Sequence, residues 1–256
     1  MKNTRETKLF LLGGYDLEMT TIKHLLEGRN NYVVADRHLN WSNAQLSTYQ
    51  QELNEYADCN IYGIELKEDI PLPPHYHRID HHNDWNDKPS SLEQVAELFG
   101  VSLNWHQQLV AANDKGYIPG MKALGATEQE IEEIRRLDRA AQGVSEEEER
   151  LAEQSISKHL IKLDNLWIVY SFTSRFSAIC DRLFPYRRLL VYTDAEWMFY
   201  GEGKAKLANL FEEDIKQSKM FHGGGENGYI GSVAHAFGKE EILVTVDKIK
   251  KIYESI

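Results

Sequence analysis

Three adjacent side chains that can bind metal ions, Asp80, His81 and His82, follow an apolar segment that predicts a β-strand. In open parallel sheets, ligands bind beyond the carboxyl ends of the strands. Carboxylate and imidazole groups together suit divalent magnesium, manganese, zinc or iron. The triplet therefore indicates a metal site, and the alternative reading is a polar surface turn.

Acidic residues also occupy the ends of the other predicted strands. They are Asp16 and Glu18, Asp36, Glu65 and, beyond a helix-like segment, Asp114. Such crowding of like charge is costly without a cation that neutralises it. We expect these acids to share a cation site with the histidines. The alternatives are a first-turn position for Glu18, a cap for Asp36 and an ordinary turn for Asp114.

The elements that must position these residues alternate between strands and helices. Short apolar runs predict strands, and i, i+3, i+4 apolar spacing predicts helices. This alternation predicts an α/β fold with a parallel sheet covered by helices on both faces. The strands are expected at 8–12, 31–36, 59–66 and 75–80, and the helices at 19–28, 44–56 and 91–100.

The chain beyond residue 114 changes character. Two long charged helices with capping signals come first, and strands then return. We predict an N-terminal domain at 1–144, a linker helix at 145–164 and a smaller α/β C-terminal domain at 165–256. In the last of these, EILVTV at 241–246 is predicted as a strand and the remaining residues as a helix.

Composition narrows the classes of function. With 29 basic and 40 acidic residues the net charge is −11, which disfavours broad binding to long nucleic acids. The two cysteines, Cys59 and Cys180, form no CxxC motif, so a disulfide framework is not expected. The apolar run LFLL is too short for a signal peptide, and no apolar stretch approaches a membrane span. We therefore expect a cytoplasmic protein.

The N-terminal motifs resemble those of the DHH phosphoesterases. IDHHN at 79–83 resembles the family signature, and LGGYDLE at 12–18 resembles its first motif, with Asp16 and Glu18 as the acids. Glu65 in YGIEL and Asp114 in AANDKG match two further acidic positions. The sequence departs from the family at Leu12, where a histidine is usual, and has glutamate at 18 and 65 where aspartate is usual.

The C-terminal half is similar to the same family. GGGENGYIG at 223–231 keeps four glycines of a family motif that continues into His-x-x-Ala-Ala-Gly. The usual histidine is replaced by Glu226. The resemblance therefore covers most of the chain outside a divergent middle.

The resemblance implies a role for each of these residues. Asp16 and Glu65 would bind one Mn²⁺ or Mg²⁺ ion, and Glu65 would bridge to a second ion. With Leu12 in place of the histidine, the first ion position is weakened, rebuilt with a residue such as Asp36, or lost. Asp80 would orient His81, and His82 would face the phosphate. The residues expected at the second ion are Glu18, Glu65, His81 and Asp114.

Substrate contacts are expected from the C-terminal domain. The backbone N–H groups of Gly223, Gly224 and Gly225 would cradle a phosphate, and Arg175 is a candidate second anchor. The alternatives are a flexible glycine loop and a structural arginine.

The sequence leads to a metal-dependent phosphohydrolase with a water activated by two metal ions. Its expected partner is a small phosphorylated molecule such as a nucleotide or a short oligonucleotide, without long nucleic acid or membrane. A non-catalytic sensor or scaffold of the same fold is the alternative, and a single-strand nuclease is a weaker one. A homo-oligomer is compatible with the sequence, which leaves the oligomeric state open.

Overall fold

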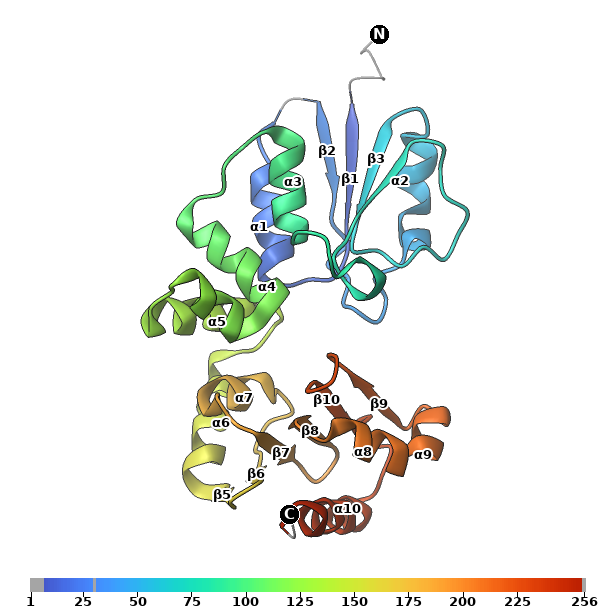
Figure 1. The fold of residues 1–256 in the computed structure, drawn as a ribbon. Coiled ribbons are helices and arrows are strands. Elements are labelled where there is room, and N and C mark those ends of the chain that lie inside the picture. The colour runs from blue at the N-terminus through green and yellow to red at the C-terminus, as the bar shows by residue number, and fades with distance from the viewer. Residues whose placement is uncertain (1–6, 30, 255–256) are drawn as a thin grey trace. The chain divides into compact units, whose positions relative to one another are not determined.

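The computed structural model describes residues 7–29 and 31–254, which divide into two compact units, 1–143 and 144–256. Figure 1 shows a separate sheet in each unit. Neither unit contains a helix in its described residues that is long and apolar enough to cross a membrane.

The first unit is built on a parallel sheet of four strands in the order β2-β1-β3-β4. Its elements in chain order are β1 (Lys8–Leu12), α1 (Leu17–Leu26), β2 (Tyr32–Ala35), η2 (Leu46–Tyr49), α2 (Gln50–Glu55), β3 (Asn60–Ile64), β4 (Tyr76–Ile79), η3 (Asn83–Trp85), α3 (Ser91–Phe99), α4 (Trp105–Leu124) and α5 (Glu128–Ala141). The predicted parallel sheet with helices on both faces is confirmed.

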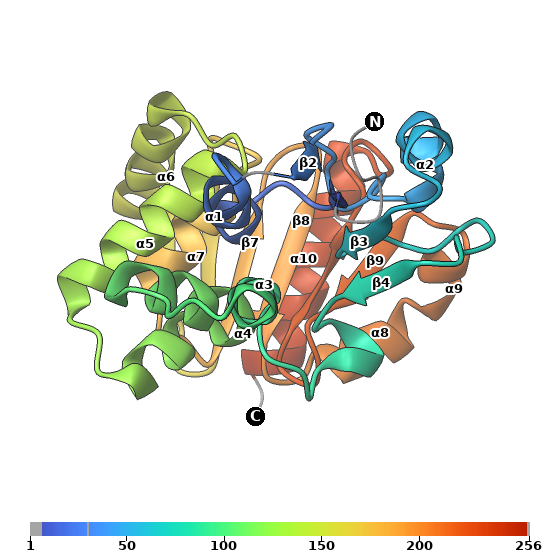
Figure 2. The same cartoon turned by 90° about the horizontal axis from the view of Figure 1, so that it is seen from above.

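Strand β1 shows why both faces of this sheet are covered. Side chains alternate between the two faces of a strand, and every residue from Leu9 to Leu12 is buried. Leu9 and Leu11 pack in a cluster with Leu46 and Leu53 on the side of η2 and α2. Figures 1 and 2 show α1 and α3 on the opposite side of the sheet from α2. A central strand buried on both faces directs its carboxyl end to the rim, where polar groups can gather.

The second unit contains a mixed sheet of six strands in the order β5-β6-β7-β8-β10-β9. Its elements are α6 (Glu146–His159), β5 (Leu160–Lys162), β6 (Trp167–Tyr170), α7 (Ser177–Leu183), β7 (Arg188–Tyr192), β8 (Trp197–Gly201), α8 (Lys204–Leu210), α9 (Glu212–Lys216), β9 (Met220–Gly223), β10 (Tyr229–Ser232) and α10 (Lys239–Glu254). The predicted linker segment 145–164 forms α6 and β5 of this unit, and Ala152 on α6 is buried in a cluster with Val169 on β6.

The prediction of a strand at 241–246 is wrong, because these residues lie inside helix α10. The buried residues of α10 are Ile242, Val246, Ile249 and Tyr253, a spacing that places them on one side of a helix. Val244 is 68% exposed, although a buried strand would have covered it. The short apolar run concealed the helical period, which becomes visible only when the following residues are included.

The close approach of β1 and β3 leads to a test of packing at Gly13. A β-carbon on Gly13 would overlap the backbone carbonyl oxygens of Ile64 and Glu65. We expect Gly13→Ala to lower the free energy of unfolding by about 1–3 kcal/mol, because backbone atoms must shift. Gly116→Ala is the matched control, since its added β-carbon meets no atom within 4 Å. Urea denaturation of both variants measures the difference, and equal stabilities would contradict the packing argument.

Candidate metal centre

Three acidic side chains converge on the imidazole of His81. Its Nε2 atom lies 2.5 Å from Asp114 Oδ2, 3.4 Å from Glu65 Oε1 and 3.7 Å from Glu18 Oε2. Glu18, Glu65 and His81 are each 5% exposed or less. The structure therefore brings together four of the predicted ligands, from α1, the end of β3, the segment after β4, and α4.

Helix α3 holds two of these carboxylates with its N-terminal end. Ser91 Oγ donates a hydrogen bond of 2.6 Å to Glu65 Oε1, and the backbone N–H of Leu92 donates one of 3.0 Å to Glu18 Oε1. The N-terminus of a helix carries partial positive charge and unsatisfied N–H groups, so it favours carboxylates. Ser90 begins α3 with a capping box that includes Glu93. The sequence analysis did not identify Ser91 as a partner of Glu65. The capping signal at Ser90, directly before it, marks the start of the helix.

The remaining polar atoms of the cluster have the character of metal ligands. Glu18 Oε2, Glu65 Oε2, His81 Nε2 and Asp114 Oδ2 are buried without a hydrogen-bond partner among the described residues. His81 Nε2 and Asp114 Oδ2 are in close contact with each other, whereas the oxygens of the two glutamates lie farther from His81 Nε2. Buried polar atoms are nearly always satisfied, so several orphans at one point indicate a missing partner. A divalent cation fits this donor set, because carboxylate and imidazole groups are its usual ligands.

The electrostatics of the site agree with this assignment. Burial raises the pKa of Glu18 well above its usual value, and the negative charges of Asp114 and Glu65 add to the rise. Burial by itself would lower the pKa of His81, but the carboxylates of Asp114 and Glu65 outweigh it and raise that pKa to about 10. A proton on these groups substitutes for a cation, so protons and a metal ion compete for the site.

Glu65 lies in a backbone conformation that few side chains adopt. Its φ is +53°, in the left-handed region, directly after strand β3 ends at Ile64. Its backbone N–H still donates to Ile79 O of β4 at 2.9 Å. Left-handed backbone at a residue with a side chain is uncommon and persists where the surrounding structure fixes it. Here it accompanies a carboxylate that turns toward His81 at the end of the sheet.

Asp16 is buried beside this cluster but has a second task. Its Oδ1 accepts a hydrogen bond of 2.8 Å from the N–H of Met19 and so caps helix α1. Burial, followed by the charges of Glu65 and Asp114, raises the pKa of Asp16 well above its usual value. One carboxylate oxygen of Asp16 is therefore engaged in capping helix α1.

The first predicted ion position has few further ligands. Leu12 is 1% exposed in the core at the end of β1. Asp36, which we considered as a substitute ligand, binds Lys23 Nζ at 2.8 Å and the N–H of His38 at 2.8 Å. The structure therefore brings together the residues expected at the second ion, and Asp36 is not among them.

The side chain of Asp80 lies against His82, whereas the sequence predicted that it would orient His81. Asp80 Oδ1 accepts a hydrogen bond of 2.9 Å from the N–H of His82 and lies 3.2 Å from its Nδ1. An aspartate readily bonds the backbone two residues ahead, which brings its carboxylate to the second histidine. Asp80 therefore orients His82, whose Nδ1 also lies 4.0 Å from Glu65 Oε1. The hydrogen bond to Asp80 raises the pKa of His82.

A buried ionic network from α5 supports the cluster and was absent from the sequence predictions. Asp138 Oδ1 accepts a hydrogen bond of 3.2 Å from the N–H of Leu17, the first residue of α1. Arg135 bonds Asp138 Oδ2 at 2.6 Å and Asn113 Oδ1 at 3.0 Å. The network thus connects the start of α1, next to Asp16, with the residue before Asp114. No signal in the sequence marks it, because Arg135 and Asp138 look like ordinary residues of a charged helix.

The predicted substrate residues lie in the second unit. Arg175 is half exposed and its Nε contacts Glu148 Oε1 at 3.4 Å. Gly223 ends β9, and Gly224 and Gly225 follow with φ of +70° and +67°. The carbonyl groups of Gly223 and Gly225 accept hydrogen bonds from the ammonium group of Lys204, which is 8% exposed. The buried ammonium group of Lys204 therefore binds the carbonyl groups of the glycine loop.

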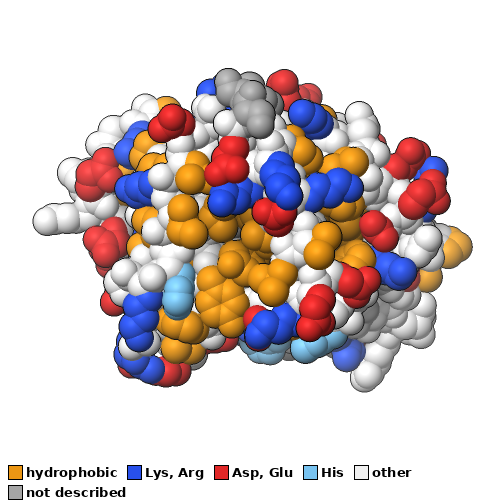
Figure 3. Space-filling model, turned by 90° about the horizontal axis from the view of Figure 1, so that it is seen from below, with side chains coloured by type: hydrophobic (Ala, Val, Ile, Leu, Met, Phe, Trp, Pro, Cys, Tyr) orange, Lys and Arg blue, Asp and Glu red, His pale blue; other side chains and the backbone are white. Residues whose placement is uncertain are grey.

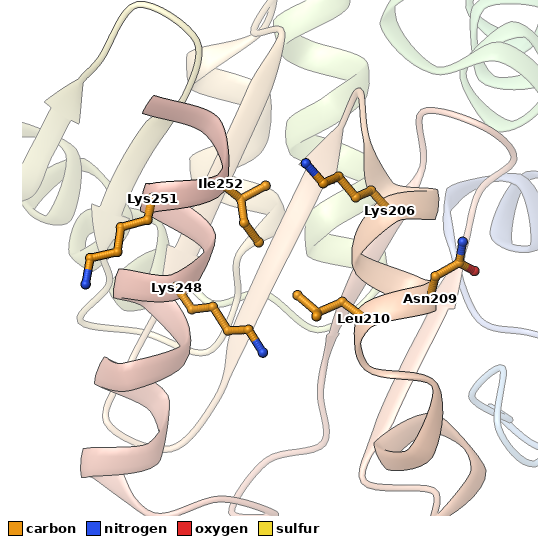
Figure 4. A pocket seen from close by; sticks show the side chains of 6 residues that line it. All are labelled: Lys206, Asn209, Leu210, Lys248, Lys251 and Ile252. Atoms are coloured by element: carbon orange, nitrogen blue, oxygen red, sulfur yellow. The ribbon is translucent and has the colours of Figure 1, made fainter. Parts of the chain in front are cut away.

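A pocket lies elsewhere in this unit, between α8 and α10. Figure 3 shows one face of the molecule where basic and apolar side chains intermingle. Figure 4 shows the side chains that line the pocket. Lys251 pairs with Asp247 at 2.6 Å, and the ammonium group of Lys248 lies 5.2 Å from the ring centre of Phe211. The residues that line it are Lys206, Asn209, Leu210, Lys248, Lys251 and Ile252. It contains no predicted site residue.

The fold and these motifs define the class of protein to which the chain is similar. The structure has the fold of a solved DHH domain, which confirms the predicted resemblance in fold. No protein-family model matches the sequence, and the search of curated proteins also finds no match.

Three solved structures each align with at least 90% of this chain. The DHH domain of a member of the s1p family of ribosomal proteins aligns with 95% of this chain and 87% of its own, at 10% identity and a TM-score of 0.51. The pGpG-specific phosphodiesterase PggH from Vibrio cholerae aligns with 96% of this chain and 98% of its own, at 13% identity and a TM-score of 0.47. RecJ from Thermus thermophilus, in complex with Mn²⁺, aligns with 90% of this chain and 50% of its own, at 10% identity and a TM-score of 0.37.

The raised pKa values predict how metal stabilisation depends on pH. Carboxylates with raised pKa values bind protons more tightly when folded, so the metal-free protein loses stability as pH rises from their unfolded values through the raised ones. The contribution of His81 is complete below its unfolded pKa of about 6.5 and is lost as pH rises through about 10. Since Mn²⁺ competes with these protons, its stabilisation should grow with pH.

We therefore expect Mn²⁺ to raise Tm by about 3–8 °C near pH 8, and by less than about half of that near pH 6. Melting curves recorded with Mn²⁺ and with a chelator measure both increments. Asp114→Asn should remove the effect, whereas Asp36→Asn, the matched control outside the cluster, should retain it. An increment that shrinks with rising pH would contradict the competition between protons and metal.

The ionic network predicts that Asp138→Asn weakens both the fold and the metal site. The substitution removes the negative charge from the contact of 2.6 Å between Asp138 and Arg135, and breaking a buried ion pair costs about 3–5 kcal/mol. It should also lower Mn²⁺ affinity by about 10-fold, as changes in residues that support metal ligands do. Urea denaturation and Mn²⁺ titration measure the two effects. Glu147→Gln, which breaks the exposed pair with Arg150, should change neither quantity.

Proposed function

We propose that this protein is a metal-dependent phosphoester hydrolase that acts on a small phosphorylated substrate. The observation that carries the proposal is the convergence of Glu18, Glu65, His81 and Asp114, four of whose buried polar atoms have no hydrogen-bond partner among the described residues. Three carboxylates and one imidazole suit Mn²⁺ or Mg²⁺. The DHH phosphoesterase fold of the chain is in keeping with this chemistry.

The residues around the metal centre have complementary tasks in this proposal. A divalent ion held there would supply an activated water and neutralise charge on the phosphoryl oxygens. His82 is partly exposed, and its Nδ1 faces Asp80. Because Asp80 raises the pKa of His82, the imidazole holds a proton that it can donate to the leaving oxygen. Asp80 thus acts as the positioning residue for the proton donor.

The proposed substrate is small for an electrostatic reason. The net charge of −11 repels an extended phosphate backbone, whereas one or two phosphates need only local neutralisation. We include the glycine loop in the proposal, since the N–H groups of residues 223–225 and the nearby ammonium of Lys204 favour an anion. Arg175 remains a candidate second anchor.

A non-catalytic metal or nucleotide sensor is the second candidate, and Leu12 is the observation in its favour. Leu12 is buried in the core, Asp36 is engaged by Lys23, and Asp16 caps α1, so one ion per chain is better supported than two. Equilibrium dialysis with Mn²⁺ measures the stoichiometry. One bound ion with turnover supports a hydrolase that works with a single complete site, and one bound ion without turnover supports the sensor.

Turnover itself is tested with a panel of phosphoesters in the presence of Mn²⁺. Relative to the wild type, His82→Gln should lower kcat by about 10²–10⁴-fold while Mn²⁺ binding persists, because it removes only the proton donor. Asp114→Asn should lose both turnover and tight Mn²⁺ binding. Asp36→Asn should retain both. The hydrolase proposal fails if wild-type protein releases no more product than Asp114→Asn across the panel.

A further inference from the structure

One aromatic side chain lies against the candidate metal centre without a task in the mechanism above. Trp41 contacts His82 in an edge-to-face arrangement, with ring centres 5.2 Å apart and planes at 66°. The indole is 49% exposed, which is unusual for the largest apolar side chain. Its neighbour His82 is the proposed proton donor, so Trp41 borders the position of the reacting phosphate.

The indole lies flat on the backbone of Gly14. A β-carbon at Gly14 would come within 2.6 Å of Cδ2 and Cε2 of Trp41, the two atoms shared by both rings of the indole. This position near the middle of the ring system means that one indole face covers Gly14. Because half of the side chain is nevertheless exposed, the indole keeps a surface that a ligand can contact.

The loop that carries Trp41 is fixed rather than loose. Leu39 is buried and forms a parallel bridge with Gly14. Asn40 closes the turn, because its Oδ1 accepts a hydrogen bond of 3.1 Å from the N–H of Ser42 and its carbonyl accepts one of 3.0 Å from Asn43. An aromatic surface held in place in this way binds a planar ligand with little loss of conformational entropy.

We propose that Trp41 is a specificity-determining residue that stacks on the aromatic base of a nucleotide whose phosphate is bound beside His82. This inference rests on the proposed function for the location of the phosphate, and it narrows the substrate class to nucleotides. Because the two ring centres lie 5.2 Å apart, one ligand can contact both Trp41 and His82. Stacking of a base on an aromatic side chain contributes about 1–3 kcal/mol.

The test compares two ligands that share a phosphate and a ribose and differ in the base. Binding of adenosine 5′-monophosphate and ribose 5-phosphate to the full chain with Mn²⁺ is measured by calorimetry. We expect the wild type to bind the nucleotide about 5- to 100-fold more tightly. Trp41→Ala should abolish this preference while affinity for ribose 5-phosphate stays unchanged, and Trp41→Phe should keep most of it.

Trp105→Ala is the matched control, since Trp105 is also exposed but donates a hydrogen bond to Glu130. It should retain the preference for the nucleotide. Equal affinities of the two ligands for the wild type, no binding of either, or a preference that survives in Trp41→Ala would each overturn the inference. Because binding is measured without turnover, a base preference that depends on Trp41 stands even if the phosphoester panel yields no product.

Discussion

Repulsion among buried carboxylates is the constraint on which the first unit depends. Glu18 and Glu65 lie almost fully buried within 4 Å of one imidazole nitrogen, Asp114 lies closer still, and Asp16 is buried beside them. Buried carboxylates without compensation are costly, so the apoprotein must either bind protons or bind a cation. The raised pKa values of Asp16, Glu18 and His81 describe the first option, and the four orphaned donor atoms describe the second. The stability of the unit, its dependence on pH and its affinity for metal therefore all depend on how these buried charges are neutralised.

The remainder of the unit keeps these charges in place. The N-terminus of α3 binds one oxygen of Glu65 and one of Glu18, which leaves the other oxygens for a ligand. From helix α5, Asp138 and Arg135 connect the start of α1 with α4. Glu18 and Glu65 are thus each held by a hydrogen bond that leaves one oxygen unused. Such support from neighbouring residues fixes the geometry of metal ligands and tunes their affinity.

Side chains at the same rim suit different parts of a ligand. His82, oriented by Asp80, faces the proposed phosphate, and the indole of Trp41 lies next to it over Gly14. Gly14 is needed there because a side chain would occupy the place of the indole. In the second unit, the buried ammonium of Lys204 holds the carbonyl groups of the glycine loop. At the rim of the first unit, a side chain that suits a phosphate therefore lies next to one that suits an aromatic ring.

Local sequence was sufficient for the parallel sheet and for the grouping of acidic and histidine side chains at its rim, because apolar runs mark strands and the ends of parallel strands meet at one edge. It was insufficient for 241–246, where a short apolar run belonged to a longer helical period. It also could not pair Asp80 with His82, give Asp16 its capping role, or reveal Asp138 and Trp41. Those assignments depend on backbone turns and on contacts between distant parts of the chain, as between Trp41 and His82 or Leu17 and Asp138. The sequence by itself determined which groups carry the charge, and the tertiary structure decided which of their atoms remain free for a ligand, because each carboxylate has two oxygens and only packing commits one of them.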